Sequence, residues 1–180
     1  MEVQTSNLID VIKKRKSIRN FIFKKLTQQV IKEILECGRF ALEENEAQPY
    51  RVNVVVHPTV KMMLGEISPE YADIYEAASC CFVIFLDLER STDRIKDLLA
   101  IGALIENILL GVHAIPKIGA ISLDINMDHK DKINEIFKLS SKRYEFMGLI
   151  CVGAINEELE RVRSKKTKNR RPIEEFTDWF

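Results

Sequence analysis

The most informative stretch of the sequence is STDRIKDLLAIGALIENILLGVHAIP, residues 91–116. Ser91 or Thr92 is suited to cap the start of a helix, and Pro116 marks where that helix ends. Over residues 98–115 apolar side chains cover nearly the whole circumference, and a helix that is apolar all round must be covered all round. The stretch therefore predicts a helix of about 24 residues and ~36 Å. We expect it to form the core of a homodimer; the alternative is a central helix in a monomer.

Around this stretch, the hydrophobic patterns alternate between helical and strand periods. Helical spacing predicts helices over residues 8–16, 27–42, 59–67, 71–78 and 129–139, with Thr27 as the cap of the second. Short β-branched or apolar runs predict strands over residues 52–56, 80–86, 119–123 and 146–152. The last 25 residues show no strong period. The sequence therefore predicts one layered domain of the α+β or α/β class.

Composition and cysteine usage point to an ordinary globular domain. The chain has 180 residues, of which 46% are hydrophobic and 30% charged, enough for a proper core. Four cysteines and three histidines are scattered without a C-x-x-C spacing, so we expect buried reduced thiols, no metal site and a cytoplasmic location. Glu106, Asn107 and His113 interrupt the longest apolar stretch, which argues against a membrane partner. We expect His113 to be a core histidine.

The net charge is zero, but two segments are strongly basic. Residues 13–25 and residues 161–171 each carry seven Lys or Arg side chains and no acidic one, which leaves an acidic middle. Arg, Lys and Ser close together suit a phosphate or another compact anion, although a solvated helix end has the same composition. The second segment has no aromatic residue between its charges, and the acidic middle repels a polyanion. We therefore expect no nucleic-acid partner.

The residues that precede the first predicted strand form an acidic segment, Ala41-Leu42-Glu43-Glu44-Asn45-Glu46-Ala47-Gln48-Pro49-Tyr50. Its amides and carboxylates are able to hydrogen-bond a heterocycle. The same composition also describes a plain acidic loop.

Five motifs, in this order along nearly the whole chain, resemble those of the FMN-dependent nitroreductase family in its short single-domain form. Arg15-Lys16-Ser17-Ile18-Arg19 resembles the family pattern Arg-Arg-Ser-x-Arg, and Phe21 follows it as expected. The other four are Gln48-Pro49-Tyr50 for Gln-Pro-Trp, Asn107-Ile108-Leu109-Leu110 in the central helix, a strand over 146–153 that ends in Gly, and Lys168-Asn169-Arg170-Arg171-Pro172-Ile173-Glu174-Glu175.

The resemblance implies an α+β fold with a central mixed or antiparallel sheet flanked by helices, and a long apolar helix at the core of a homodimer. It implies one domain over residues 1–180, whose residues 155–180 form an extended tail that reaches toward the partner subunit. FMN-binding residues follow from the matched motifs. Those implied to meet the phosphate, ribityl chain or ring edge are Arg15, Lys16, Ser17, Arg19, Lys168 and Arg170, and those implied near the flavin of one or the other subunit are Asn45, Glu46, Gln48, Ile121 and Ser122.

The resemblance also implies an activity. It is hydride transfer from NAD(P)H through FMN to a small electrophile such as a nitroarene, quinone or enone, in a ping-pong cycle. Because the flavin carries the chemistry, no catalytic side chain is expected. The alternative is a non-catalytic relative on the same fold that binds flavin or another phosphorylated ligand.

Overall fold

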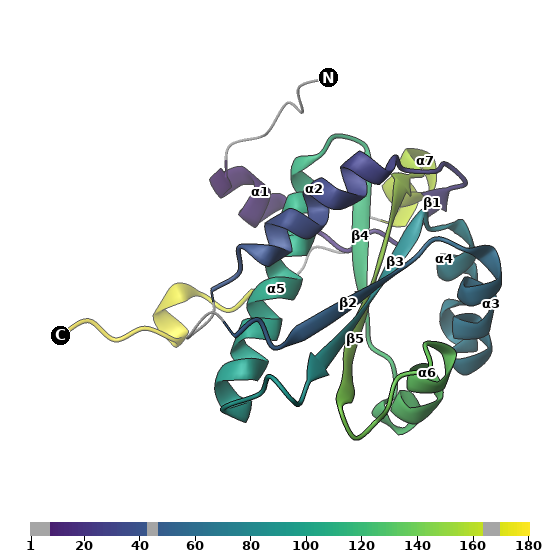
Figure 1. Ribbon diagram of the computed structural model, residues 1–180. Helices are drawn as coiled ribbons and strands as arrows, with labels where there is room; N and C mark the ends of the chain where they lie inside the picture. Colours follow the sequence, from purple (N-terminus) through teal and green to yellow (C-terminus); the bar gives the residue numbers. More distant parts are fainter. Residues whose placement is uncertain (1–7, 43–46, 164–169) are drawn as a thin grey trace.

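The described residues of the computed structural model, 8–42, 47–163 and 170–180, fold around an antiparallel sheet with helices on both faces (Figure 1). In the described part of the chain the sheet has five strands, and β5 pairs with β1, β3 and β4, while β2 pairs with β3. All of these pairings are antiparallel. The strands are β1 (Phe21–Ile22), β2 (Tyr50–Val55), β3 (Cys80–Asp87), β4 (Ile118–Leu123) and β5 (Tyr144–Ile155).

Helices α2 (Gln28–Arg39) and α5 (Arg94–Ala114) cover one face of the sheet, and α3 (Pro58–Ile67), α4 (Ala72–Ala77) and α6 (Lys130–Ile136) cover the other. The remaining helices are α1 (Leu8–Lys14), which contacts α5, and α7 (Glu157–Arg163), which follows β5. Single 3₁₀ turns are η1 (Pro69–Tyr71), η2 (Met127–His129) and η3 (Ile173–Glu175).

Strand β3 explains why the sheet has two apolar faces. All of its residues are buried. Because successive side chains alternate, Cys81 packs with the helices α3, α4 and α6, whereas Cys80 packs with α2 and α5. The two neighbouring cysteines therefore point to opposite faces of the sheet. The expectation that all four thiols are buried is wrong for Cys37, which is exposed although its side chain lies beside Gly111 of α5.

The first residues of α2 and α5 show which predicted N-caps are correct. Thr27 caps α2, since its side chain accepts a hydrogen bond from the Val30 N–H. The start of α5 is capped by Asp93, which accepts from the N–H groups of Ile95 and Lys96, so the prediction of Ser91 or Thr92 is wrong. The Ser91 hydroxyl donates to Asp97 instead. The Asp93 carboxylate reaches two orphan N–H groups and also carries a charge favoured by the helix dipole.

Helix α5 is apolar all round, as predicted, but one chain covers only one side of it. Ile101, Leu104, Ile108 and Val112 are buried against the sheet and α2. Ile95, Leu98 and Leu99 of the same helix remain exposed. None of the helices in the described part of the chain combines the length and apolar character needed to cross a bilayer.

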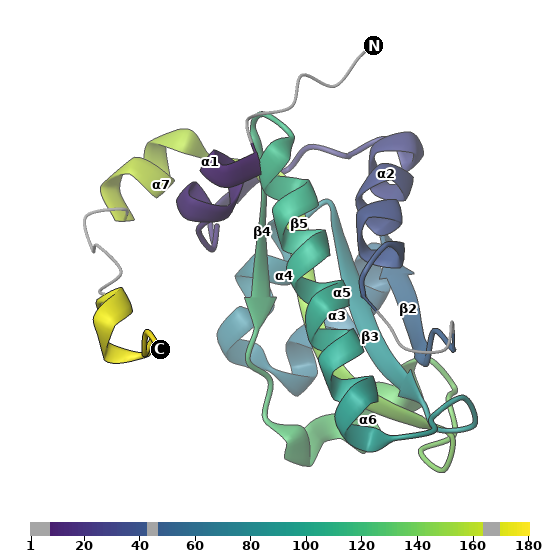
Figure 2. The ribbon, with the colours of Figure 1, turned by 90° about the vertical axis from the view of Figure 1, so that its left-hand side faces the viewer.

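The predicted extended tail over residues 155–180 is wrong for its first part. Residues 157–163 form helix α7, and Glu160 of this helix is buried. From Arg170 onward the chain projects away from the sheet and ends with exposed Trp179 and Phe180 (Figure 2).

Candidate functional site

The basic segment of residues 15–19 joins α1 to β1 and is fixed along strand β4. The Ile18 N–H donates to the Ala120 carbonyl at 2.9 Å, and the Ile18 side chain is buried. Directly beneath it is Gly119, where an added Cβ would lie 2.5 Å from Ile18 Cγ1. Only glycine permits this close approach. Ile18 therefore holds its polar neighbours at the sheet.

Arg15 reaches across to α5. Its Nε lies 3.4 Å from Glu106 Oε1, and only 16% of its side chain is exposed. His113 follows Glu106 by seven residues, or about two turns, on the same side of the helix. Burial lowers the pKa of His113, and the charges of Arg15 and Lys16 lower it further. The lowered pKa favours the neutral imidazole. His113 is only half-buried, so the expectation of a core histidine is not confirmed.

A buried carboxylate on α7 holds the other end of the basic segment. Glu160 Oε1 accepts hydrogen bonds from the backbone N–H groups of Arg19 and Asn20 and from Asn20 Nδ2, each at 2.9 Å. Arg163 Nη2 donates to Glu160 Oε2 at 3.1 Å and to the Ser17 carbonyl at 2.6 Å. Burial by itself raises the pKa of Glu160, but the Arg163 and N–H donors outweigh it and lower the pKa. Helix α7 thus clamps the backbone of residues 17–20.

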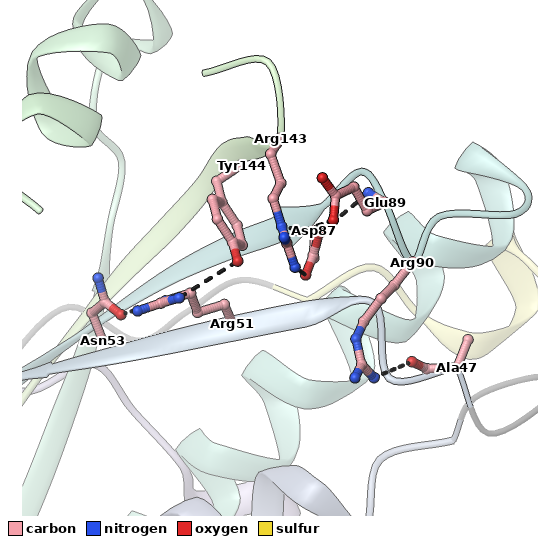
Figure 3. Close-up of polar contacts among 8 residues, drawn as sticks. All are labelled: Ala47, Arg51, Asn53, Asp87, Glu89, Arg90, Arg143 and Tyr144. Carbon is pink, nitrogen blue, oxygen red and sulfur yellow. Dashed lines mark hydrogen bonds and ion pairs between the residues drawn. The ribbon is translucent and has the colours of Figure 1, made fainter. Parts of the chain in front are cut away.

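The loop before β2 is held by polar contacts at the end of β3 (Figure 3). The Arg90 guanidinium donates to the Ala47 carbonyl at 3.1 Å, and the Asp87 N–H donates to the Pro49 carbonyl at 2.9 Å. Between these residues Gln48 has a φ of 43°, in the left-handed region. The loop conformation is therefore fixed from both sides of Gln48.

Asp87 is itself anchored in this network. Its carboxylate accepts from Arg143 Nε at 3.1 Å and Nη2 at 3.0 Å, and this arginine holds the pKa of Asp87 below its usual value. Arg143 also pairs with Glu89 at 2.6 Å. On the neighbouring strands, Arg51 contacts both Asn53 and Tyr144 (Figure 3).

The other residues expected at the flavin site lie in different parts of the molecule. The Ile121 side chain is buried among the helices α3, α4 and α6, whereas Ser122, the next residue, is exposed on the α5 side of β4. Arg170 is exposed in the projecting C-terminal segment, which both ribbon views draw apart from α1. Asn45, Glu46 and Lys168 lie outside the described residues. One chain therefore brings Arg15, Lys16 and Ser17 together beside β4 but does not bring Arg170 to them.

Sequence reasoning missed Glu160 and Arg163 as site-supporting residues. Their i, i+3 spacing and the acidic start of the segment were visible signals of a short helix. Their contact with residues 17–20 crosses more than a hundred residues and has no local signature.

Lys16 is exposed, whereas Arg15 and Ser17 are half-buried. Two grooves on the described surface have other linings, and neither includes Arg15, Lys16 or Ser17. Arg19 lines the smaller one together with Glu70 and Asp73.

No protein-family model matches the sequence, and no curated protein matches it. Solved structures do. A candidate nitroreductase from Desulfovibrio desulfuricans, solved in complex with FMN, superposes with a TM-score of 0.85 and 26% identity over 98% of this chain and 99% of its own. This chain has the nitroreductase fold. A second candidate nitroreductase, from Exiguobacterium sibiricum and also in complex with FMN, gives a TM-score of 0.84 at 18% identity over 99% of this chain and 100% of its own.

The nitroreductase fold also relates the chain to a larger protein. The NADPH:FMN oxidoreductase of Vibrio harveyi, complexed with NAD⁺, gives a TM-score of 0.82 at 17% identity over 97% of this chain and 77% of its own. The Desulfovibrio structure confirms the resemblance drawn from the five motifs. The observed antiparallel sheet, flanked by helices, confirms the predicted α+β class.

Proposed function

We propose that this chain is an FMN-dependent oxidoreductase that uses NAD(P)H to reduce a small electrophile such as a nitroarene, quinone or enone, in a ping-pong cycle. The observation that carries the proposal is the basic segment of residues 15–19, pinned to β4 within a nitroreductase fold. The Desulfovibrio protein, solved with FMN, shares this fold over almost the entire length of both chains.

The donor set beside β4 fits the phosphate of FMN. Arg15 offers a planar fork of N–H donors, Lys16 a compact ammonium and Ser17 a hydroxyl. Bound FMN would supply the hydride-transfer chemistry, and the chain would supply binding and orientation. Arg15 and Lys16 would balance the charge of the phosphate, and Lys168 and Arg170 would supply further positive charge if the assembled protein brings them there. Ile18 and Glu160 keep the backbone of this segment in place.

We further propose that the active form is a homodimer. Ile95, Leu98 and Leu99 leave one side of α5 uncovered, and the C-terminal segment exposes Trp179 and Phe180. A second copy would cover both apolar sets. The Gln48 loop, already rigid through Asp87 and Arg90, is then available to approach the flavin of the other subunit.

The cofactor is tested by the visible absorbance spectrum of the purified protein, recorded before and after denaturation and with added FMN. We expect flavin absorbance that changes on denaturation, when the flavin is released to solvent. The holoprotein should then oxidise NADH or NADPH in the presence of menadione as a quinone acceptor. A protein that remains colourless with added FMN would refute the proposal. Flavin binding without NAD(P)H oxidation would favour the non-catalytic alternative.

The dimer is tested by removal of the apolar C-terminal segment. Deletion of residues 173–180 removes Phe176, Trp179 and Phe180, and we expect it to shift the protein toward monomer in sedimentation velocity. Phe40→Ser is the matched control, because Phe40 is also strongly exposed but lies at the end of α2. It should leave the sedimentation coefficient unchanged. A deletion variant that stays dimeric would show that the tail does not hold the subunits together.

A further inference from the structure

A large groove lies on the face of the molecule opposite α5. It has a volume of about 980 Å³ and is formed by α3, α4 and the residues that follow β1, β2 and α4. None of the residues assigned to FMN above lines it. Its size falls in the usual range of small-molecule sites.

The walls of this groove are fixed. On one side, the Ser79 hydroxyl donates to the Lys24 carbonyl, and the Lys24 N–H donates to the Ile22 carbonyl at 2.7 Å, which holds residues 23–25 in place. On the other side, α3 and α4 approach closely at Gly65, where an added Cβ would lie 3.3 Å from Ala72 Cβ. The hollow is therefore preformed.

The lining is mainly apolar. Phe23, Val56 and Met62 stand around the groove with 77%, 55% and 61% of their surfaces exposed. Small residues, Gly65, Ala77 and Ala78, form part of the lining and leave room between the large ones. Covering three large apolar side chains in one concave surface would favour a ligand with an apolar body.

A buried ammonium group gives the groove its polarity. Lys61 also lines the groove and is only 8% exposed. Its Nζ donates to the Glu76 carbonyl at 3.0 Å and to the Ala78 carbonyl at 2.7 Å, at the C-terminal end of α4. An ammonium has three N–H donors, and these two bonds account for two of them among the described residues. The third has no acceptor among the described residues, and Lys61 is one of the residues that line the groove.

The charges around the groove favour an anion. Lys24 and Lys25 line it together with Lys61, and the acidic residues that line it are Glu66 and Glu76. Both glutamates are exposed on the helix surfaces, so solvent screens them more than it screens the buried Lys61. The groove thus offers three cations against two carboxylates, and its only buried charge is positive.

We propose that this groove binds a small amphipathic carboxylate, whose hydrocarbon part covers Phe23, Val56 and Met62 and whose carboxylate accepts a hydrogen bond from Lys61. A singly charged head group suits the site, because one donor is open and a dianion would cost more to desolvate there. The site is separate from the proposed flavin site and does not depend on it.

The test uses decanoate and decanol, which share an apolar chain and differ in charge. Binding is followed by isothermal titration calorimetry and by the NMR signals of ¹³C-labelled methionine methyl groups, among which Met62 lines the groove. We expect saturable decanoate binding that shifts the Met62 signal. Decanol should bind with an affinity at least about tenfold lower. Equal affinity for the two probes, or no decanoate binding up to its solubility, would overturn the proposal.

Two variants test the location and the ammonium. Ala72→Leu adds bulk to an exposed position in the groove and should abolish decanoate binding while flavin absorbance stays unchanged. Lys61→Met should remove the preference for decanoate over decanol. Lys32→Gln, an exposed lysine on α2 at the opposite face, is the control and should bind like the wild type. A folded Ala72→Leu protein with wild-type affinity would place decanoate elsewhere and refute the site.

Discussion

Arg15→Ala is expected to weaken FMN binding by about 10- to 150-fold, the range for loss of a charge-assisted hydrogen bond. Arg15 is mostly buried between α1 and α5, and its guanidinium is already oriented by Glu106 at 3.4 Å. Loss of this pre-ordered donor would remove the phosphate contact proposed for it, which an exposed lysine would not replace. The dissociation constant is measured by titrating the apoprotein into FMN and following flavin fluorescence.

Lys14→Ala is the matched control for this prediction. It removes the same charge from the neighbouring position, but Lys14 is exposed and pairs with Asp10 at 3.1 Å within α1. Its effect on FMN affinity should be small and should vanish at higher salt. Equal losses in both variants would show a general charge effect and would contradict a specific Arg15 contact.

Arg170→Ala serves a different purpose. The resemblance to nitroreductases implies a loss of FMN affinity similar to that of Arg15→Ala, yet in one chain the segment from Arg170 onward stands apart from α1 (Figure 2). A similar loss would mean that the C-terminal segment joins the site in the assembled protein. An unchanged FMN affinity would show that Arg170 is not part of the flavin site.

Glu160→Ala is expected to lower the free energy of unfolding by about 2–3 kcal/mol, because partly buried N–H groups lose their acceptor. The substitution leaves the N–H groups of Arg19 and Asn20 without their acceptor and leaves Arg163 without its carboxylate. Urea denaturation measures the loss. Glu158→Ala, at an exposed position of the same helix, should change stability by no more than about 0.5 kcal/mol.

The same variant should also weaken FMN binding, because residues 17–20 lose their attachment to α7. Addition of saturating FMN should therefore stabilise the Glu160→Ala protein less than the wild type. A stable Glu160→Ala protein with unchanged FMN affinity would show that this clamp is not needed.

The Glu160 clamp also has a defined pH dependence. Its pKa in the folded protein lies below the ordinary value of 4.5, so its stabilisation is fully present above that pH and is lost as the pH falls through the folded value. The difference in unfolding free energy between the wild type and Glu160→Gln should accordingly shrink as the solution is acidified below 4.5. A difference that stays constant with pH would contradict this.

Much of the fold is local and was predictable. The uninterrupted apolar run over residues 80–86 predicted a buried strand, and β3 is one; the Thr27 cap placed the start of α2 correctly. The two-residue strand β1 was missed, because it is too short to show a period. Asp93 rather than Ser91 or Thr92 caps α5, because neighbouring cap-type residues compete and the choice depends on where the chain enters the helix.

The candidate site was predictable in part. The motif of residues 15–19 drew attention to Arg15, Lys16 and Ser17, but nothing local showed that Ile18 is the residue that fastens them to Gly119. Nor did the acidic segment before β2 show that Arg90 and Asp87 fix its last residues.

By itself, the sequence determined the apolar all-round character of α5, the two-faced sheet and the order of the nitroreductase motifs, since each is written in side-chain periodicity or in neighbouring residue types. Only the tertiary structure decided that Glu160 clamps residues 17–20, that α5 keeps one side uncovered and that Lys61 lies in an apolar groove. These features join residues from distant parts of the chain. Their energies come from burial and from hydrogen bonds that exist only once the elements have packed.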